Sequence, residues 1–127
     1  MEDIGNADSE RLALRALREM EEEVGVGSDK IEVFGQLQSL TTISAFSIQP
    51  ILAFVKNDYQ ACIDRNEVAE LFEVPAHYLL HPHNLRSHTF NTHHQSHRIF
   101  AVSYDNHFIW GATAQIIHSL QRHLSLY

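Results

Sequence analysis

The sequence is short of cysteine, proline and glycine, with one, three and five of them among 127 residues. A single cysteine, Cys62, permits no internal disulfide and is typical of a reducing compartment, so we expect a cytoplasmic location. The scarcity of proline and glycine, together with 44% hydrophobic residues, excludes a collagen-like or low-complexity chain and predicts one that folds.

Positive charge and long apolar segments are also scarce. Nine Lys and Arg stand against 16 Asp and Glu, so the chain lacks the positive field with which proteins bind nucleic acid. The longest aliphatic or aromatic run, residues 51–55, is far below the roughly 20 residues that a membrane-spanning helix needs. The acidic N-terminus has no apolar stretch of the kind found in secretory signals. We therefore expect neither a nucleic acid partner nor a membrane helix.

The length suits one ordinary domain, so we expect a single domain over residues 1–127. A first helix is predicted from about Glu10 to Val24, because residues with capping side chains precede it and Gly25 follows it. Further predictions are strands at 30–37, 45–49, 51–55, 67–74 and 99–104, a short helix at 76–80 and a closing helix from Ala112. Together these elements indicate an α/β fold built in layers.

Some expectations go beyond the type of element. Residues 51–55 are apolar throughout and predict a strand buried on both faces. Residues 67–74 fit a helix as well as a strand, and we favour the strand. Residues 81–97 are polar and predict exposed turns or a loose hairpin. The closing helix is expected to pack one stripe on the core, made of Thr113, Ile116, Ile117, Leu120 and Leu124.

The first helix carries an acidic face. At 100° per residue, Glu19, Glu22 and Glu23 fall within an arc of roughly 100°, away from the apolar face. Their repulsion, and their place at the negative end of the helix dipole, each cost a few tenths of a kcal/mol. A divalent cation would offset that cost, and carboxylates suit Mg²⁺ or Mn²⁺. The alternative from these residues alone is a solvated acidic face.

The order of residues on this helix resembles the Nudix box. Glu10 stands eight residues before Arg18, and the box then continues through Arg18-Glu19-Met20-Glu21-Glu22-Glu23-Val24-Gly25-Val26. Downstream segments are similar to the coenzyme A diphosphatase branch of that superfamily. They lie at 34–37, 42–50, 66–75 and 109–114, and the last of them, Ile-Trp-Gly-Ala-Thr-Ala, is the most specific.

This resemblance implies a Nudix-type α/β/α sandwich with a mixed sheet, and a metal-dependent hydrolase. The expected substrate is the small nucleotide coenzyme A or a derivative, cleaved to 4′-phosphopantetheine and adenosine 3′,5′-bisphosphate. Carried over by position, Glu19, Glu22 and Glu23 would bind Mg²⁺ or Mn²⁺, and Arg18 would orient a glutamate. Glu22 and Glu67 are both candidates for the general base, with a slight preference for the helix residue.

The chain departs from the family pattern at its start. A complete box has a glycine six residues before its first Glu, where this chain has Ile4, and Gly5 is one residue too close. Nothing before Met1 supplies the glycine loop or the strands that precede it. We therefore expect an N-terminally incomplete domain, with Met1 an internal methionine as one explanation. The alternatives are a hydrolase for ADP-ribose or a dinucleotide, and an inactive remnant that acts only as a binding module.

Other reactive residues are expected to be structural. His81 and His83, and the group His93, His94 and His97, have ligand-like spacing, yet no cysteine or carboxylate accompanies them, so solvated loop histidines are favoured over zinc ligands. Cys62 is expected to be a small buried residue. Phe108 and Trp110 are expected to pack the closing helix on the sheet, with stacking on adenine as the less favoured reading.

Overall fold

The computed structural model describes residues 2–42 and 45–124, with side chains from Glu10 onward. The chain divides into two compact units. The first unit comprises Met1–Gln36 and Ile51–Phe72, and the second comprises Leu37–Pro50 and Glu73–Tyr127. The single domain over residues 1–127 stays a prediction. No helix within the described residues is both long and apolar enough to cross a bilayer.

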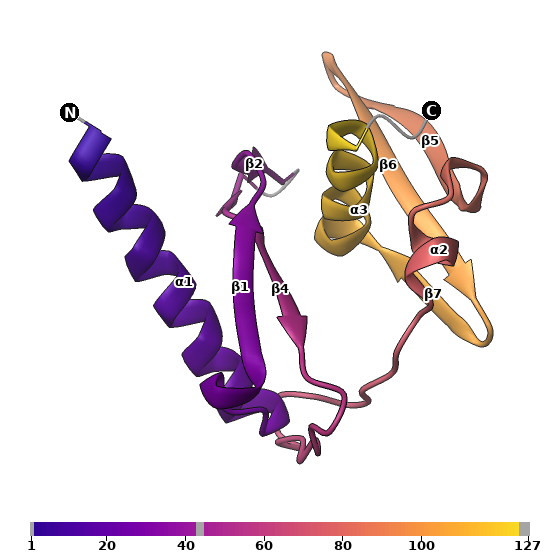
Figure 1. Cartoon of the computed structure of the whole chain (residues 1–127). Coiled ribbons are helices and arrows are strands. Elements are labelled where there is room, and N and C mark those ends of the chain that lie inside the picture. The colour runs from indigo at the N-terminus through magenta and orange to yellow at the C-terminus, as the bar shows by residue number, and fades with distance from the viewer. Residues whose placement is uncertain (1, 43–44, 125–127) are drawn as a thin grey trace. The chain divides into compact units, whose positions relative to one another are not determined.

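The first unit contains a long helix and a two-stranded sheet. Helix α1 spans Glu2–Val24 and is followed by the 3-10 helix η1, Ser28–Lys30. Strands β1, Ile31–Gln36, and β4, Ile51–Val55, pair antiparallel, and α1 lies beside them (Figure 1). The predicted end of the helix is confirmed, because Gly25 follows with φ +74°. The predicted start at Glu10 is wrong, since no proline interrupts residues 2–9 and the helix continues through them.

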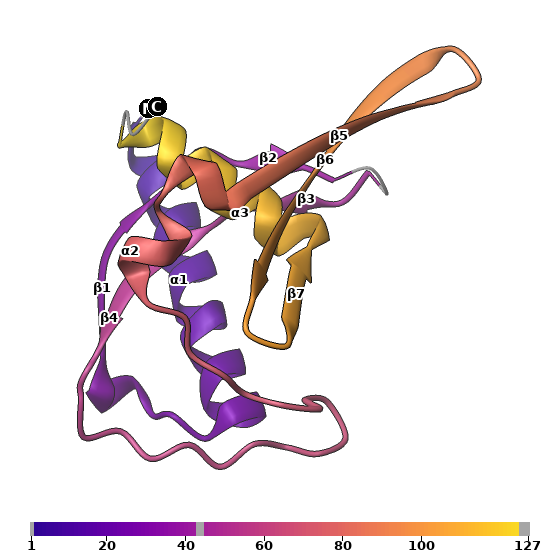
Figure 2. The same ribbon diagram turned by 90° about the vertical axis from the view of Figure 1, so that its right-hand side faces the viewer.

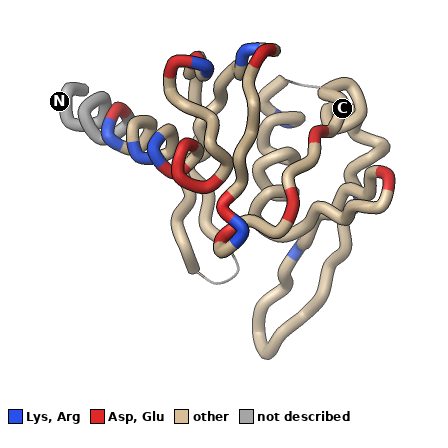
Figure 3. Tube along the Cα trace, turned by 90° about the horizontal axis from the view of Figure 1, so that it is seen from below, with Lys and Arg blue, Asp and Glu red and all other residues tan. Residues whose placement is uncertain are grey.

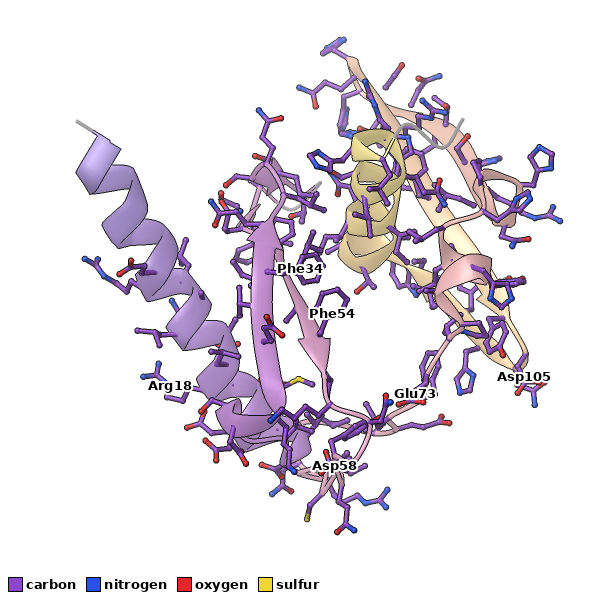
Figure 4. The ribbon with its side chains drawn as sticks, in the orientation of Figure 1. Arg18, Phe34, Phe54, Asp58, Glu73 and Asp105 are labelled. Carbon is purple, nitrogen blue, oxygen red and sulfur yellow. The ribbon has the colours of Figure 1, made fainter. Side chains whose placement is uncertain are left out.

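The sheet of the first unit has an exposed aromatic pair. Phe34 of β1 and Phe54 of β4 stack with their ring centroids 4.3 Å apart (Figure 4). They are 52% and 62% exposed. The strand at 51–55 is confirmed, but its predicted burial on both faces is wrong. Two paired strands offer too little surface to cover both sides of an apolar strand.

The segment after β4 is irregular. The predicted strand at 67–74 is wrong, because residues 65–67 form a turn and no strand follows in the described chain before α2, Ala76–Leu79. Near its start, Lys30 Nζ lies 3.0 Å from Asp58 Oδ2. The hydrogen bond and the opposite charge raise the pKa of Lys30 and lower the pKa of Asp58. This exposed ion pair joins the segment to η1 where it leaves β4.

The second unit contains two sheets and two helices. Strands β2, Leu40–Thr41, and β3, Ser47–Ile48, form a short pair. After α2 and the 3-10 helix η2, Pro82–Asn84, a three-stranded antiparallel sheet precedes the closing helix. Its strands are β5, Leu85–Thr92, β6, Gln95–Tyr104, and β7, His107–Trp110, and the closing helix α3 spans Gly111–His123. Figure 2 shows the β5–β6 hairpin extending beyond α3.

The α/β class is confirmed, since α1 precedes the strands β1 to β4, α2 follows them, and α3 follows β5 to β7. All strand pairs among the described residues are antiparallel, and they form three separate sheets. The short helix after Pro75 and the strand at 99–104 are confirmed. The hairpin expected within 81–97 is also confirmed and is more regular than predicted, with eight pairs from Leu85–Val102 to Thr92–Gln95.

The core of the second unit lies between β6 and α3. Phe100 and Val102 of β6 are buried, as are Ala114, Ile117 and Gln121 of α3. The predicted stripe of α3 is therefore rotated: of its five residues only Ile117 is fully buried, and Thr113 and Leu124 are exposed. Phe108 and Trp110 are 64% and 65% exposed, so their predicted packing role is wrong. The small side chain of Ala114 lets the helix backbone approach the sheet more closely than a larger residue would.

Gln121 is the one buried polar residue of this core in the described chain. Its Nε2 donates to the carbonyl of Leu79 at 2.8 Å, and its Oε1 has no partner among the described residues.

We expect Gln121→Ala to lower the free energy of unfolding by about 2 kcal/mol, because a hydrogen bond is lost and a cavity opens. Gln121→Leu fills the space and removes the unpaired oxygen, so the free energy of unfolding is expected to fall by only about 1 kcal/mol. Urea denaturation of both variants checks this, and equal losses would contradict it.

Candidate active site on the first helix

The C-terminal end of α1 gathers the acidic residues of the predicted site. Figure 3 shows their red segments at the end of the helix opposite the N-terminus. Glu19 and Glu22 are exposed and Glu23 is half-buried. The helix is unbroken through all three, so their spacing of three and four residues keeps them on one face. It ends where the amide of Gly25 donates to the carbonyl of Glu21 at 3.0 Å.

The loop that follows β4 in the sequence contacts this end of α1 through its backbone. The amide of Cys62 donates to the carbonyl of Val24 at 2.8 Å, and the amide of Asp64 donates to the carbonyl of Glu23 at 2.7 Å. These bonds satisfy carbonyls that a helix end otherwise leaves without a partner. Cys62 itself is exposed, so its predicted burial is wrong. Its backbone, and not its thiol, occupies the place beside the helix.

Glu67 follows this docked loop. The carbonyl of Asp64 accepts from the amides of Glu67, at 3.0 Å, and Val68, at 2.8 Å. The carboxylate of Asp64 also accepts from the amide of Asn66, at 3.0 Å. Asp64 thus links Glu23 and Glu67 through two successive backbone hydrogen bonds. Glu67 is exposed in a turn and not in the predicted strand.

Asp64 is a residue that the reading of the sequence missed. Its signal was present, since Asp-Arg-Asn is a typical start of a turn in which an Asp side chain bonds the amide two residues on. That signal favours a turn at 64–67 over the strand that Val68, Leu71 and Phe72 suggest. Nothing in it indicates that the same residue bonds to the end of α1, because that contact joins residues 41 positions apart.

The arginines of α1 lie on its outer surface. Arg15 Nε is 3.3 Å from Glu19 Oε1, with both side chains at least half exposed. Such a pair contributes little to stability, typically below about 1 kcal/mol. Arg18 is exposed on the side of α1 away from β1 (Figure 4). Within the described residues Arg18 makes no ion pair, so its role in orienting a glutamate stays a prediction.

The donor set on α1 fits a hard divalent cation by its chemistry. Carboxylate oxygens are the ligands that Mg²⁺ and Mn²⁺ prefer. In the described part of the chain, no three His, Cys, Asp or Glu side chains converge as metal ligands. Glu19 and Glu22 extend into solvent, and rotation about their side-chain bonds would let them approach one ion with Glu23. The assignment of these three glutamates to a metal therefore remains a prediction.

The candidate histidines lie apart from this site in the sequence, all in the second unit. The rings of His81 and His83 are 5.0 Å apart in an edge-on arrangement. His93 and His94 are exposed at the turn of the β5–β6 hairpin, and His97 is half-buried with Nε2 2.8 Å from Thr92 Oγ1. His93, His94 and His97 thus belong to the β5–β6 hairpin, and His81 and His83 are exposed at η2.

Comparison with known proteins finds relatives along nearly the whole chain, the acidic helix included. It is 36% identical over 121 residues to the uncharacterized Nudix hydrolase NudL of Yersinia pestis (strain Pestoides F). The same identity and length hold for NudL of Yersinia pseudotuberculosis serotype O:1b (strain IP 31758). The match covers 94% of this chain, so the chain is similar to these Nudix hydrolases over nearly its whole length. The chain spans 60% of the length of these relatives. No family model matches it.

Proposed function

We propose that this protein is a metal-dependent diphosphatase that hydrolyses coenzyme A or its derivatives. The observation that carries the proposal is the end of α1, where Glu19, Glu22 and Glu23 share one solvent-facing side of an unbroken helix. The relationship to Nudix hydrolases supports the reaction class. The resemblance of residues 109–114 to the coenzyme A branch supports the substrate. A reducing compartment such as the cytoplasm, suggested by the single cysteine, is part of the same proposal.

The reaction assigns a task to each residue of the site. Glu19, Glu22 and Glu23 hold the cation, and Arg18 positions one of these carboxylates. A bound Mg²⁺ or Mn²⁺ supplies positive charge at the diphosphate and makes water a better nucleophile. Water adds to one phosphorus while the bridging P–O bond breaks. Glu22 or Glu67 takes the proton that the water gives up.

The charge of the first unit explains why a cation is needed. Its residues include 14 Asp and Glu against six Lys and Arg. A diphosphate approaching α1 therefore meets like charge, which a cation held by Glu19, Glu22 and Glu23 would offset. Hydrolysis is accordingly expected to stop when a chelator removes the metal.

The test is hydrolysis of coenzyme A with Mg²⁺ or Mn²⁺ by the 127-residue chain, beside the same chain extended upstream in its reading frame. We expect 4′-phosphopantetheine and adenosine 3′,5′-bisphosphate, identified by chromatography and phosphorus NMR. ADP-ribose and a dinucleotide are assayed in parallel. Faster cleavage of either would replace coenzyme A with that substrate. Absence of hydrolysis of all three by both chains would favour the inactive binding module.

A further inference from the structure

Strand β6 has a free edge over residues 95–100. On one side, β5 pairs with β6 from Gln95 to Val102. On the other side, β7 pairs only with Ala101 to Tyr104, so the stretch before Ala101 has no neighbouring strand there among the described residues. Figure 2 shows β6 continuing beyond the end of β7. Alternate residues of such an edge leave their N–H and C=O groups without a partner strand.

A groove of about 1030 Å³ follows this edge. Every residue from Gln95 to Phe100 lines it, although the side chains of successive strand residues point to opposite faces of a sheet. The groove therefore runs along the edge of β6 and not over one face. Trp110 and Gly111, where β7 passes into α3, also line it, whereas none of its described lining residues comes from β5. The groove thus lies on the free side of β6, and all of its lining residues belong to the second unit.

The β2–β3 pair forms another wall of the groove. Phe46, which precedes β3, lines the groove and is 69% exposed. Thr42 holds the turn that carries it, because the amide of Thr42 donates to the carbonyl of Phe46 at 2.9 Å and Thr42 Oγ1 accepts from the amide of Phe46 at 3.2 Å. Gln115 Nε2 of α3 donates to the carbonyl of Thr41 at 3.3 Å. This hydrogen bond joins the wall to α3 within the same unit.

The charge of the groove indicates the kind of chain that would pair with the edge. The two acidic residues of the second unit, Glu73 and Asp105, are labelled in Figure 4, and neither lines the groove. Arg98 lies within the free edge and is exposed. A second copy of this edge would bring another Arg98 into the groove, and like charges on facing strands destabilise a sheet. An acidic side chain opposite Arg98 would form an attractive pair, so charge favours an acidic chain over a second copy.

We propose that the free edge of β6 binds an extended acidic peptide segment of a partner protein, which adds one strand to the β5–β6–β7 sheet. Hydrogen bonds between the two backbones supply affinity, and alternate side chains supply selectivity. Trp110 pairs with Ala101 and so shares a face with Ile99, which suits apolar side chains on that side. The opposite face carries Arg98. The segment therefore alternates apolar and acidic residues over about six positions.

This inference goes beyond the proposed hydrolysis and does not depend on it, because the binding needs neither a metal nor α1. The test is a titration of the 127-residue chain with an acetylated and amidated six-residue peptide in which valine and glutamate alternate. Trp110 is the single tryptophan of the chain, so its fluorescence reports on the groove. We expect a saturable change in its emission and slower hydrogen exchange of the amides at 95–100. A peptide that alternates valine and lysine is expected to bind about tenfold more weakly.

Backbone methylation of the peptide tests strand addition without any change in the protein. One peptide carries N-methyl groups on its glutamates and a second carries them on its valines. Alternate residues of a strand direct their N–H groups to opposite edges, so only one of the two peptides keeps the edge that pairs with β6. We expect that peptide to bind and the other to fail. Equal binding by both peptides would overturn the proposal.

Reversal of one charge tests the selectivity. Arg98→Glu is expected to reverse the preference, so that the lysine peptide binds more tightly than the glutamate peptide. Arg86→Glu is the matched control, because Arg86 is exposed on β5 and does not line the groove, and circular dichroism checks the folding of both variants. An unchanged preference in Arg98→Glu, or the same reversal in Arg86→Glu, would overturn the proposal. Dimers that protect the amides at 95–100 without peptide, detected by sedimentation and hydrogen exchange, would also overturn it by assigning the edge to a second copy.

Discussion

Replacing Glu22 with Gln is expected to lower the rate of coenzyme A hydrolysis by at least about a thousandfold. The amide keeps the size of the side chain but loses the negative charge that holds a cation, and it cannot take a proton from water. Glu22 is exposed, so the substitution should leave the fold intact, with a change in stability within about 0.5 kcal/mol. Steady-state rates in saturating Mg²⁺ or Mn²⁺, with circular dichroism as the check on folding, measure the effect.

Glu21→Gln is the matched control for this prediction. Glu21 lies on the same turn of α1 but points away from the arc that holds Glu19, Glu22 and Glu23, so little loss of rate is expected. Similar losses in both variants would mean that the general charge of the helix end matters and that Glu22 has no special role. An unchanged rate in Glu22→Gln would remove it as both ligand and base.

Replacing Gly25 with Ala is expected to destabilise the first unit by about 3 kcal/mol. Gly25 has φ +74°, which an alanine adopts only with strain. A Cβ there would also lie 2.8 Å from the carbonyl oxygen and 2.9 Å from the amide nitrogen of Cys62. Those are backbone atoms held to α1 by the Cys62–Val24 hydrogen bond, so the loop can move away only if that bond breaks.

Gly35→Ala is the control for the backbone argument. A Cβ at Gly35 would meet no atom within 4 Å, and its φ is not in the left-handed region, so stability should stay within about 0.5 kcal/mol of the original. Urea denaturation of both variants, followed by far-ultraviolet circular dichroism, makes the comparison. Equal stability of the two variants would show that the loop does not hold the end of α1.

The local part of the site could be predicted from the sequence. The end of α1 at Gly25 and the helical spacing of Glu19, Glu22 and Glu23 depend on residues within two turns of one another. Such short-range signals can be read without knowing the rest of the fold. The same holds for the short helix after Pro75.

The parts that could not be read depend on partners distant in the sequence. Which face of α3 is buried is decided by β6, and the pattern of apolar residues on the helix suggested a neighbouring face. Cysteine is usually a buried residue type, yet Cys62 is exposed because its backbone amide bonds to the carbonyl of Val24 at the end of α1. The stacking of His118 on Phe100 forms only when a helix and a strand pack together.

The division of charge between the units changes what the isoelectric point of this chain means. Its value near 5.7 is an average over two unlike units, because the first holds 14 of the 16 acidic residues and the second holds all ten histidines. At zero net charge the chain is a pair of oppositely charged bodies, and added salt, which screens their attraction for other copies, should keep it in solution there.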